Sequence, residues 1–276
     1  MVFIMGVAAM VSLWMGGKAV IAGSMTLGSF VAFNGYLMLL SWPMMGIGYV
    51  FNLTQKGLAA MGRIQDIFAS QPEIIPAPEG ADTSVEMGDI EFQGLQFSYP
   101  GEDTMSLKGI DIKIPQGQTL GVVGVIGSGK TTLTQLLLRF HDATAGALLI
   151  GGRPIKEIPL QGLRDSLGYV SQEPFLFSTS IRDNIVLGRV SATESELEEI
   201  VQTAGLKKDV ERFPDGLDTL IGERGVSLSG GQKQRVALAR ALIKRPEVLI
   251  LDDAFSHLDS ETEEEILKNI QTQLRQ

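Results

Sequence analysis

The sequence contains no cysteine and only two histidines, His141 and His257, among its 276 residues. Without cysteine the chain has no disulfide bond, no thiolate metal site and no cysteine nucleophile. The two histidines are too far apart in the sequence to have metal-ligand spacing. A formal net charge of −9 argues against a general nucleic-acid-binding protein, so no nucleic-acid partner is expected.

Charge is almost absent from the N-terminal region, residues 1–62. Lys18 and Lys56 are the only charged side chains there, and all 32 acidic residues lie further along the chain. Such an asymmetry between the two ends is typical of a membrane segment joined to an acidic soluble domain.

Two apolar stretches occupy this N-terminal region. Residues 1–17 are barely enough to span a bilayer, which needs roughly 20 residues, whereas residues 27–51 form an uncharged run that spans it comfortably. The short segment between them predicts an antiparallel transmembrane helical hairpin, in which Pro43 kinks the second helix. A signal peptide would need a basic region before the first stretch, and a buried core hairpin would rarely contain so long an uncharged run.

Polar residues in and near these helices lead to two expectations. Lys56 and Arg63 follow the second helix and place that end in the cytoplasm by the positive-inside tendency. Asn34 and Asn52 either face a substrate cavity or form hydrogen bonds between helices, and the second interpretation is slightly favoured.

A change of composition separates this region from the rest of the chain. Residues 71–89 contain Pro72, Pro76 and Pro78 close together, which predicts an extended linker. From residue 90, short β-type runs alternate with segments of helical period, which predicts an α/β domain with a mainly parallel central sheet. We therefore expect residues 1–70 to be the C-terminal part of a transmembrane domain, 71–89 a linker and 90–276 a soluble domain. The expected strands are IEFQGLQFSY, GIDIKI, TLGVVG, ALLIGG, LGYVSQ and VLILDD.

A glycine-rich run in the soluble domain is typical of a phosphate-binding loop. GVIGSGKT, residues 124–131, fits the pattern G-x-x-x-x-G-K-[ST] and lies between a β-type run and a helical one, as such a loop requires. Backbone N–H groups of the turn and of the helix N-terminus then point at phosphate oxygens. Lys130 is expected at the β- and γ-phosphates, and the Thr131 hydroxyl is expected to bind Mg²⁺. The expected nucleotide-binding residues are Gly124, Val125, Ile126, Gly127, Ser128, Gly129, Lys130, Thr131 and Thr132.

Two aspartates end the strand-like run VLILDD. Asp252 is expected to contact Mg²⁺, directly or from the second coordination layer. A carboxylate that merely caps a helix after a buried strand is the alternative interpretation. The phosphate-binding loop upstream favours the Mg²⁺ role.

LSGGQKQR, residues 228–235, carries a resemblance to a known family. Together with the phosphate-binding loop and VLILDD, this run resembles the signature of ATP-binding cassette (ABC) proteins over essentially all of residues 90–276. The resemblance implies a P-loop NTPase fold, ATP and Mg²⁺ as cofactors, and a signature surface that closes onto the ATP held by a second subunit. The signature residues are Ser229, Gly230, Gly231 and Gln232.

Other positions match the family residue by residue. Tyr99 resembles the aromatic residue that stacks on adenine, and a tyrosine that packs in the core is the alternative. Gln172 resembles the glutamine that senses Mg²⁺ and the attacking water, so the resemblance makes it a metal-contacting residue and, with Lys130 and Asp253, a catalytic one. GERG, residues 222–225, and Asp259 resemble two loops of the subunit interface.

The order of membrane helices, linker and cassette resembles that of an exporter half-transporter. It implies ATP hydrolysis coupled to outward transport of a small amphipathic, drug-like or lipid-like molecule. It also implies an integral protein of the plasma (inner) membrane with a cytoplasmic nucleotide-binding domain. Importers of the same family usually keep the cassette on a separate chain, and DNA-repair or translation-factor relatives lack membrane helices.

Asp253 departs from the family pattern, in which glutamate follows the Walker B aspartate and polarises the attacking water. Aspartate is one methylene shorter, and a displacement of about 1 Å at a reacting centre costs about a hundredfold in rate. Unless the backbone shifts to compensate, we expect Asp253 to be a poor base. This departure resembles the degenerate half of heterodimeric exporters, which implies a second half-transporter whose Walker B motif carries the glutamate.

The switch histidine of the family is a second departure. Its position would lie beyond Gln276, and neither His141 nor His257 matches it. The chain thus resembles the final membrane hairpin and most of the cassette of a half-transporter, truncated at both ends, with the nucleotide-binding domain incomplete at its C-terminus. The alternative function is an ATP-binding, poorly hydrolysing regulatory subunit or a non-transporting fragment, and the ATPase activity of this chain alone is left open.

Overall fold

The computed structural model describes residues 2–72, 74, 85–102, 104–222 and 228–273. Most of the expected linker and most of the GERG run lie outside these described residues. The chain divides into two compact units, Met1–Pro72 and Glu73–Gln276, which are treated separately below.

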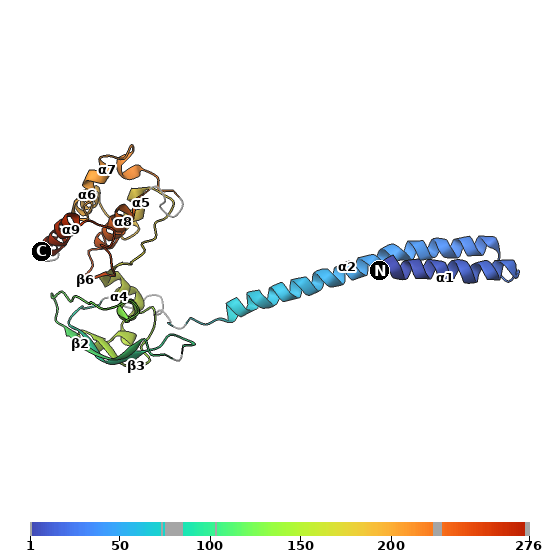
Figure 1. The fold of residues 1–276 in the computed structure, drawn as a ribbon, viewed down its shortest axis with the longest axis horizontal. Helices are drawn as coiled ribbons and strands as arrows, with labels where there is room; N and C mark the ends of the chain where they lie inside the picture. Colours follow the sequence, from blue (N-terminus) through green and yellow to red (C-terminus); the bar gives the residue numbers. More distant parts are fainter. Residues whose placement is uncertain (1, 73, 75–84, 103, 223–227, 274–276) are drawn as a thin grey trace. The chain divides into compact units, whose positions relative to one another are not determined.

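The N-terminal unit consists of two antiparallel helices, α1 (Val2–Ile21) and α2 (Leu27–Ala69), which lie side by side (Figure 1). The Thr26 hydroxyl caps α2 by accepting the Ser29 N–H at 3.2 Å. The 43 residues of α2 correspond to about 65 Å at a rise of about 1.5 Å per residue, which exceeds the thickness of a bilayer. By length and composition, α2 is long and apolar enough to cross a membrane, whereas the apolar helix Met5–Ile21 is shorter.

A polar contact joins the two helices of this unit. Ser12 Oγ donates a hydrogen bond to Asn34 Oδ1 at 3.0 Å, and Asn34 Nδ2 donates to the Phe30 carbonyl oxygen at 3.0 Å. Asn34 therefore bonds between helices, which is the favoured one of its two interpretations. Asn52 is exposed. The helix α2 continues through Pro43.

The larger sheet of the second unit is antiparallel throughout. It contains β1 (Ile90–Phe97), β2 (Leu107–Ile114), β3 (Ala145–Ile150) and β4 (Arg153–Pro154) in the order β2-β1-β3-β4. The loop between β1 and β2 is too short for the crossover connection of a dozen or more residues that parallel neighbours need. The chain therefore turns back on itself and pairs these strands in opposite directions.

A separate pair of strands is parallel. β5 (Leu167–Val170) pairs with β6 (Val248–Leu251), with Val170 opposite Leu251. The long segment between them includes α5 (Ile181–Val186), α6 (Glu194–Thr203), α7 (Lys207–Val210) and α8 (Gly230–Leu242), which supply the crossover.

The prediction of a mainly parallel central sheet is not confirmed. Among the strand pairings of the described residues, only β5 with β6 is parallel. The predicted strand TLGVVG, residues 119–124, is not assigned to a strand, and the side chains of Leu120, Val122 and Val123 are 44%, 48% and 98% exposed. The apolar residues of this run therefore gain neither a sheet partner nor burial in the structure. The other five predicted strands contain or overlap β1, β2, β3, β5 and β6.

Two apolar cores form on opposite sides of the parallel pair. One core joins the antiparallel sheet to α3 (Lys130–Leu137) and α4 (Leu160–Ser166), and the other joins α5, α6 and α8 to α9 (Ser260–Gln273). Along β6, Val248 and Ile250 pack in the first core, whereas Leu249 and Leu251 pack in the second. The period of two along a strand explains this division, since successive side chains point to opposite faces.

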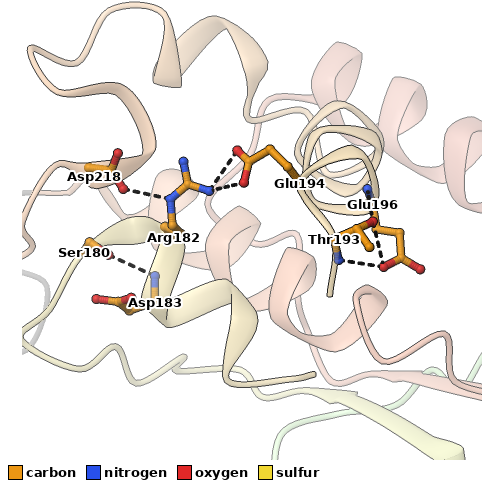
Figure 2. A network of polar contacts seen from close by, with 7 residues as sticks. All are labelled: Ser180, Arg182, Asp183, Thr193, Glu194, Glu196 and Asp218. Carbon is orange, nitrogen blue, oxygen red and sulfur yellow. Dashed lines mark hydrogen bonds and ion pairs between the residues drawn. The ribbon is translucent and has the colours of Figure 1, made fainter. Parts of the chain in front are cut away.

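Ion pairs join α5 to the start of α6 and to Asp218 (Figure 2). Arg182 on α5 donates to both carboxylate oxygens of Glu194 at 2.8 and 2.6 Å and to Asp218 Oδ1 at 2.8 Å. Thr193 and Glu196 form a capping box at the start of α6, in which Glu196 Oε2 accepts the Thr193 N–H at 2.8 Å.

The capping-box carboxylate of Glu196 has a lowered pKa. The backbone N–H of Thr193, followed by the guanidinium of Arg189, lowers the pKa of Glu196 to about 2. Both partners favour the ionised form of the carboxylate. Because the folded-state pKa lies below the ordinary value, Glu196 stabilises the fold above pH of about 4.5, and this contribution is lost as the pH falls towards 2.

We expect Glu196→Gln to lower the urea midpoint of unfolding at pH 7, because glutamine keeps a cap acceptor but loses the ion pair with Arg189. The difference from the unmodified protein should shrink as the pH falls below about 4.5. Circular dichroism at several pH values measures it. Glu198→Gln, an exposed change of the same charge on the same helix, is the control. A Glu196→Gln deficit that stayed constant down to pH of about 2 would contradict the assignment.

Candidate functional site

The first part of the site is the predicted phosphate-binding loop, residues 124–131. Gly127 and Gly129 have φ of +78° and +93°, which side chains with a Cβ rarely adopt. A Cβ at Gly129 would also lie 2.7 Å from Leu107 Cδ2 and 2.9 Å from the Ser106 carbonyl oxygen. Gly129 precedes the first residue of α3, so the loop delivers Lys130 and Thr131 at the N-terminus of a helix, where N–H groups are free for an anion.

Lys130 lies within the same loop. Its Nζ donates to the carbonyl oxygens of Gly124 at 2.8 Å and Val125 at 2.9 Å. The residues from Gly124 to Ser128, including Ile126, are exposed. The ammonium group thus lies inside the curve of an open loop, where an anionic ligand can replace its carbonyl partners.

Thr131 connects this loop to the end of β6. Thr131 Oγ1 donates to Asp252 Oδ1 at 3.3 Å, and Asp252 is buried, with 9% of its surface exposed. Tyr169 Oη donates to the other carboxylate oxygen at 3.5 Å. Burial first, and then the charge of Asp252, raises the pKa of Tyr169, so the phenol stays protonated and remains a donor to the carboxylate.

The parallel register places Gln172 beside Asp253. Val170 is opposite Leu251, and the Asp252 N–H donates to the Val170 carbonyl oxygen at 3.0 Å. Gln172 and Asp253 therefore follow the neighbouring ends of β5 and β6. Gln172 Nε2 donates to Asp253 Oδ2 at 3.2 Å. Asp253 itself has φ of +52°, a left-handed backbone that aspartate adopts more often than most residues with a Cβ.

Tyr99 is half-buried next to α3. Its hydroxyl bonds to Thr132 Oγ1 at 3.0 Å and donates to Gln135 Oε1 at 2.9 Å. Its ring packs edge-on against Phe97 and His141, with centroid distances of 4.9 and 5.5 Å. The structure therefore ties Tyr99 to the helix that follows the phosphate-binding loop, and the residue is partly buried against the first core.

The signature residues form the N-terminal turn of α8. Ser229 Oγ accepts the Gln232 N–H at 3.2 Å, and Gln232 Oε1 accepts the Ser229 N–H at 2.9 Å, which completes a capping box. Gln232 Nε2 donates to Asp209 Oδ1 at 2.9 Å, so both ends of this amide have partners within the chain. Ser229 and Gly230 are exposed, and the Ser229 hydroxyl has a hydrogen to donate to an external ligand.

Asp259, which was predicted to belong to an interface loop, caps α9. Its carboxylate accepts the Thr262 N–H and the Thr262 hydroxyl, each at 2.9 Å. The Thr262 backbone N–H, followed by its hydroxyl, lowers the pKa of Asp259. The accompanying GERG prediction falls mostly on residues outside the described part of the chain.

The contacts bring the predicted site residues into two groups. One contains the phosphate-binding loop, Asp252, Asp253 and Gln172, with Tyr99 joined to it through Thr132. The other contains the signature residues, whose described contacts run to α7 and to the segment after Asp253.

Sequence reasoning missed side chains that hold the first group in place. No signal in the sequence places Tyr169 beside Asp252, because the two residues are 83 positions apart. Asn184 and Arg240 were also missed. The buried Asn184 receives two hydrogen bonds from Arg240, each 2.8 Å long, and bonds to the Phe177 backbone. These bonds anchor the segment after Gln172 to α8.

The donor groups fit a nucleotide bound with Mg²⁺. The Thr131 hydroxyl and the Asp252 carboxylate supply oxygen ligands, which this cation prefers, and their oxygens already lie 3.3 Å apart. Lys130 and the N-terminus of α3 supply donors and positive charge for phosphate oxygens.

Comparisons with known proteins show which family the chain resembles. Residues 107–256 match the family model described as ABC transporter. The chain is 40% identical over 267 residues to the probable multidrug resistance ABC transporter ATP-binding/permease protein YheI of Bacillus subtilis, covering 97% of this chain and 46% of that protein. It is 39% identical over 259 residues to the ATP-dependent lipid A-core flippase of Desulfotalea psychrophila, covering 94% and 45%.

A solved structure described as a bacterial Atm1-family ABC exporter with ATP bound is also similar. It has a TM-score of 0.75 and 34% sequence identity, and the match covers 96% of this chain and 47% of that one. The chain thus spans about half the length of the relatives it matches. Because the family match covers more than half of the sequence and contains the phosphate-binding loop, the signature residues and Asp252, the chain belongs to the ABC transporter family.

Proposed function

We propose that this chain binds Mg²⁺ and ATP and, as one half of a dimeric exporter, couples ATP hydrolysis to the outward movement of a small amphipathic or lipid-like molecule. The observation that carries the proposal is the joining of the phosphate-binding loop to Asp252, and of Gln172 to Asp253, in one group of side chains. Relatives named as multidrug resistance transporters and a lipid A-core flippase support the class of transported molecule.

The roles of the site residues follow from their chemistry. Lys130 and the N–H groups at the start of α3 would hold the phosphates, while Thr131 and Asp252 would hold Mg²⁺. When bound, the metal would neutralise negative charge on the phosphates. Gln172 and Asp253 would orient the attacking water. Ser229, Gly230 and Gly231 would contact the ATP of a second subunit, which makes a dimer the functional form.

The N-terminal unit supports a membrane location. The uncharged part of α2 is long enough to span a bilayer, and the positively charged Lys56 and Arg63 follow it. We propose that the chain lies in the inner membrane with residues 90–276, the nucleotide-binding domain, in the cytoplasm and residues 71–89 as the linker.

Asp253 supports a heterodimer rather than two equal halves. Its carboxylate is one methylene shorter than that of glutamate and is engaged by Gln172 at 3.2 Å. In-line phosphoryl transfer depends on positioning, so a retracted carboxylate favours slow hydrolysis at this chain's own site. The intact signature turn would complete the faster site of a partner that carries glutamate.

Lys130→Ala should abolish ATP binding while leaving the helical content unchanged, because it removes the main cationic phosphate contact. Fluorescence titration of detergent-solubilised protein with a fluorescent ATP analogue measures the affinity. Lys208→Ala, which removes an exposed lysine of α7, is the control for lost charge. Equal affinities of the Lys130→Ala and unmodified proteins would refute the assigned role.

Tyr99→Ala should weaken binding of ATP and GTP alike by about 1–3 kcal/mol, the scale of a base stacked on an aromatic ring. Tyr99→Phe keeps the ring but loses the hydroxyl bonds to Thr132 and Gln135, so it should lose less affinity. Competition titrations with both nucleotides separate stacking from recognition of the base edge. A loss restricted to ATP would argue against stacking.

Asp253→Glu should increase hydrolysis at this chain's own site in the assembled heterodimer of full-length subunits, because the longer carboxylate reaches further towards the water. Asp253→Asn, which has a similar size and no charge, should lower it. Trapping of ADP with vanadate, resolved by site, is the measurement. If the unmodified dimer trapped ADP equally at both sites, Asp253 would be a competent base and the slow-site proposal would be wrong.

A further inference from the structure

Helix α8, which begins with the signature residues, contains a buried glutamine, Gln234. This residue is not among the expected nucleotide-binding residues. Its side chain is 1% exposed although its amide is polar. Buried amides are stable only when their donors and acceptor have partners, so the position of each partner indicates what the residue holds. All the partners given by the structure lie in the turn formed by residues 253–257.

The amide contacts this turn at both of its ends. Gln234 Nε2 donates to Ser256 Oγ at 3.0 Å and to the Asp253 carbonyl oxygen at 3.5 Å, while Gln234 Oε1 accepts the His257 N–H at 3.1 Å. The acceptor must face an N–H and the donors must face oxygens, so only one orientation of the amide satisfies the turn.

Asp253 is the residue of this turn with an uncommon backbone. Its φ is +52°, and conformations of this kind persist where surrounding contacts hold them. Its carbonyl oxygen accepts from Ser256 Oγ at 3.2 Å as well as from Gln234, and its carboxylate accepts from Gln172. The backbone and the side chain of Asp253 are thus held from two different directions.

Close packing joins the same turn to the start of α8. A Cβ at Gly230 would lie 2.9 Å from His257 Cδ2, and a Cβ at Gly231 would lie 2.9 Å from the His257 carbonyl oxygen. The two signature glycines therefore lie close against His257, the last residue of this turn. A displacement of the N-terminal turn of α8 towards His257 would press on the turn that carries Asp253.

We propose that Gln234 is a positioning residue, which holds the left-handed turn at Asp253 so that its carboxylate faces Gln172 and the water to be activated. In doing so it joins the signature surface and the hydrolytic carboxylate into one unit. This inference rests on the proposed function, in which Asp253 orients the water and the signature turn meets the partner's ATP.

The test uses Gln234→Met, which keeps side-chain length and burial but removes the three amide contacts. In the assembled full-length protein, ATP affinity should stay within about twofold, because the phosphate-binding loop is untouched. Vanadate trapping of ADP at the Lys130–Asp253 site should fall about tenfold or more, as expected for a misplaced reacting group. Gln202→Met, an exposed change of the same kind on α6, should alter neither quantity.

Ser256→Ala provides a second variant that does not disturb the buried side of α8. Ser256 is exposed, and its hydroxyl bridges Gln234 to the Asp253 carbonyl oxygen. Ser256→Ala should also lower vanadate trapping of ADP at this site, by a smaller factor than Gln234→Met. In an Asp253→Asn background, Gln234→Met should have little further effect, because both substitutions act on one group.

Hydrogen exchange of backbone amides, measured without nucleotide, tests the role of Gln234 without depending on ATP binding or hydrolysis. Gln234→Met should accelerate exchange of the His257 amide, the donor to Gln234 Oε1. Unchanged exchange, or accelerated exchange with unchanged trapping, would overturn the positioning role. If the unmodified protein bound no ATP, the proposed function would fail and the catalytic half of the inference with it, while exchange at His257 would still decide whether Gln234 holds the turn.

Discussion

The parallel pairing of β5 with β6 is the interaction on which the rest of the second unit depends. Each strand presents alternate side chains to two different cores, so one core packs against each face of this two-stranded pair. Burial on both faces fixes the register, because a slip of one residue would exchange the two sets of side chains. With the register set, the segments after the strands meet, and Gln172 reaches Asp253.

Much of the fold could be predicted from local pattern alone. The pattern predicted an alternation of helical segments and strands, and the β-type runs contain or overlap five of the observed strands. Strand direction was harder, because it depends on which distant segments become neighbours. The apolar composition of TLGVVG is the same whether the run is paired or exposed, so nothing within it predicted the exposed Val123.

The candidate site shows the same division between local and distant information. Glycine spacing, Lys130 and Thr131 could be read from the sequence because the phosphate-binding loop is one short segment whose backbone chemistry demands those residues. The partners of Tyr169 and Gln234 could not, since Asp252 and the 253–257 turn lie far from them along the chain. Gln232 illustrates the limit of motif matching, because both ends of its amide bond within the chain, a role that the signature pattern alone does not indicate.

The left-handed backbone at Asp253 makes the choice of residue at this position depend on the conformation of the turn. Aspartate is one of the few residues with a Cβ that enters this conformation readily, and glutamate is not. Glutamate at this position would therefore lengthen the carboxylate and strain the turn in a single step. The gain in hydrolysis from a longer acid and its cost in backbone strain are thus separable, and a change that relaxes the turn would let the longer carboxylate act with a smaller loss of stability.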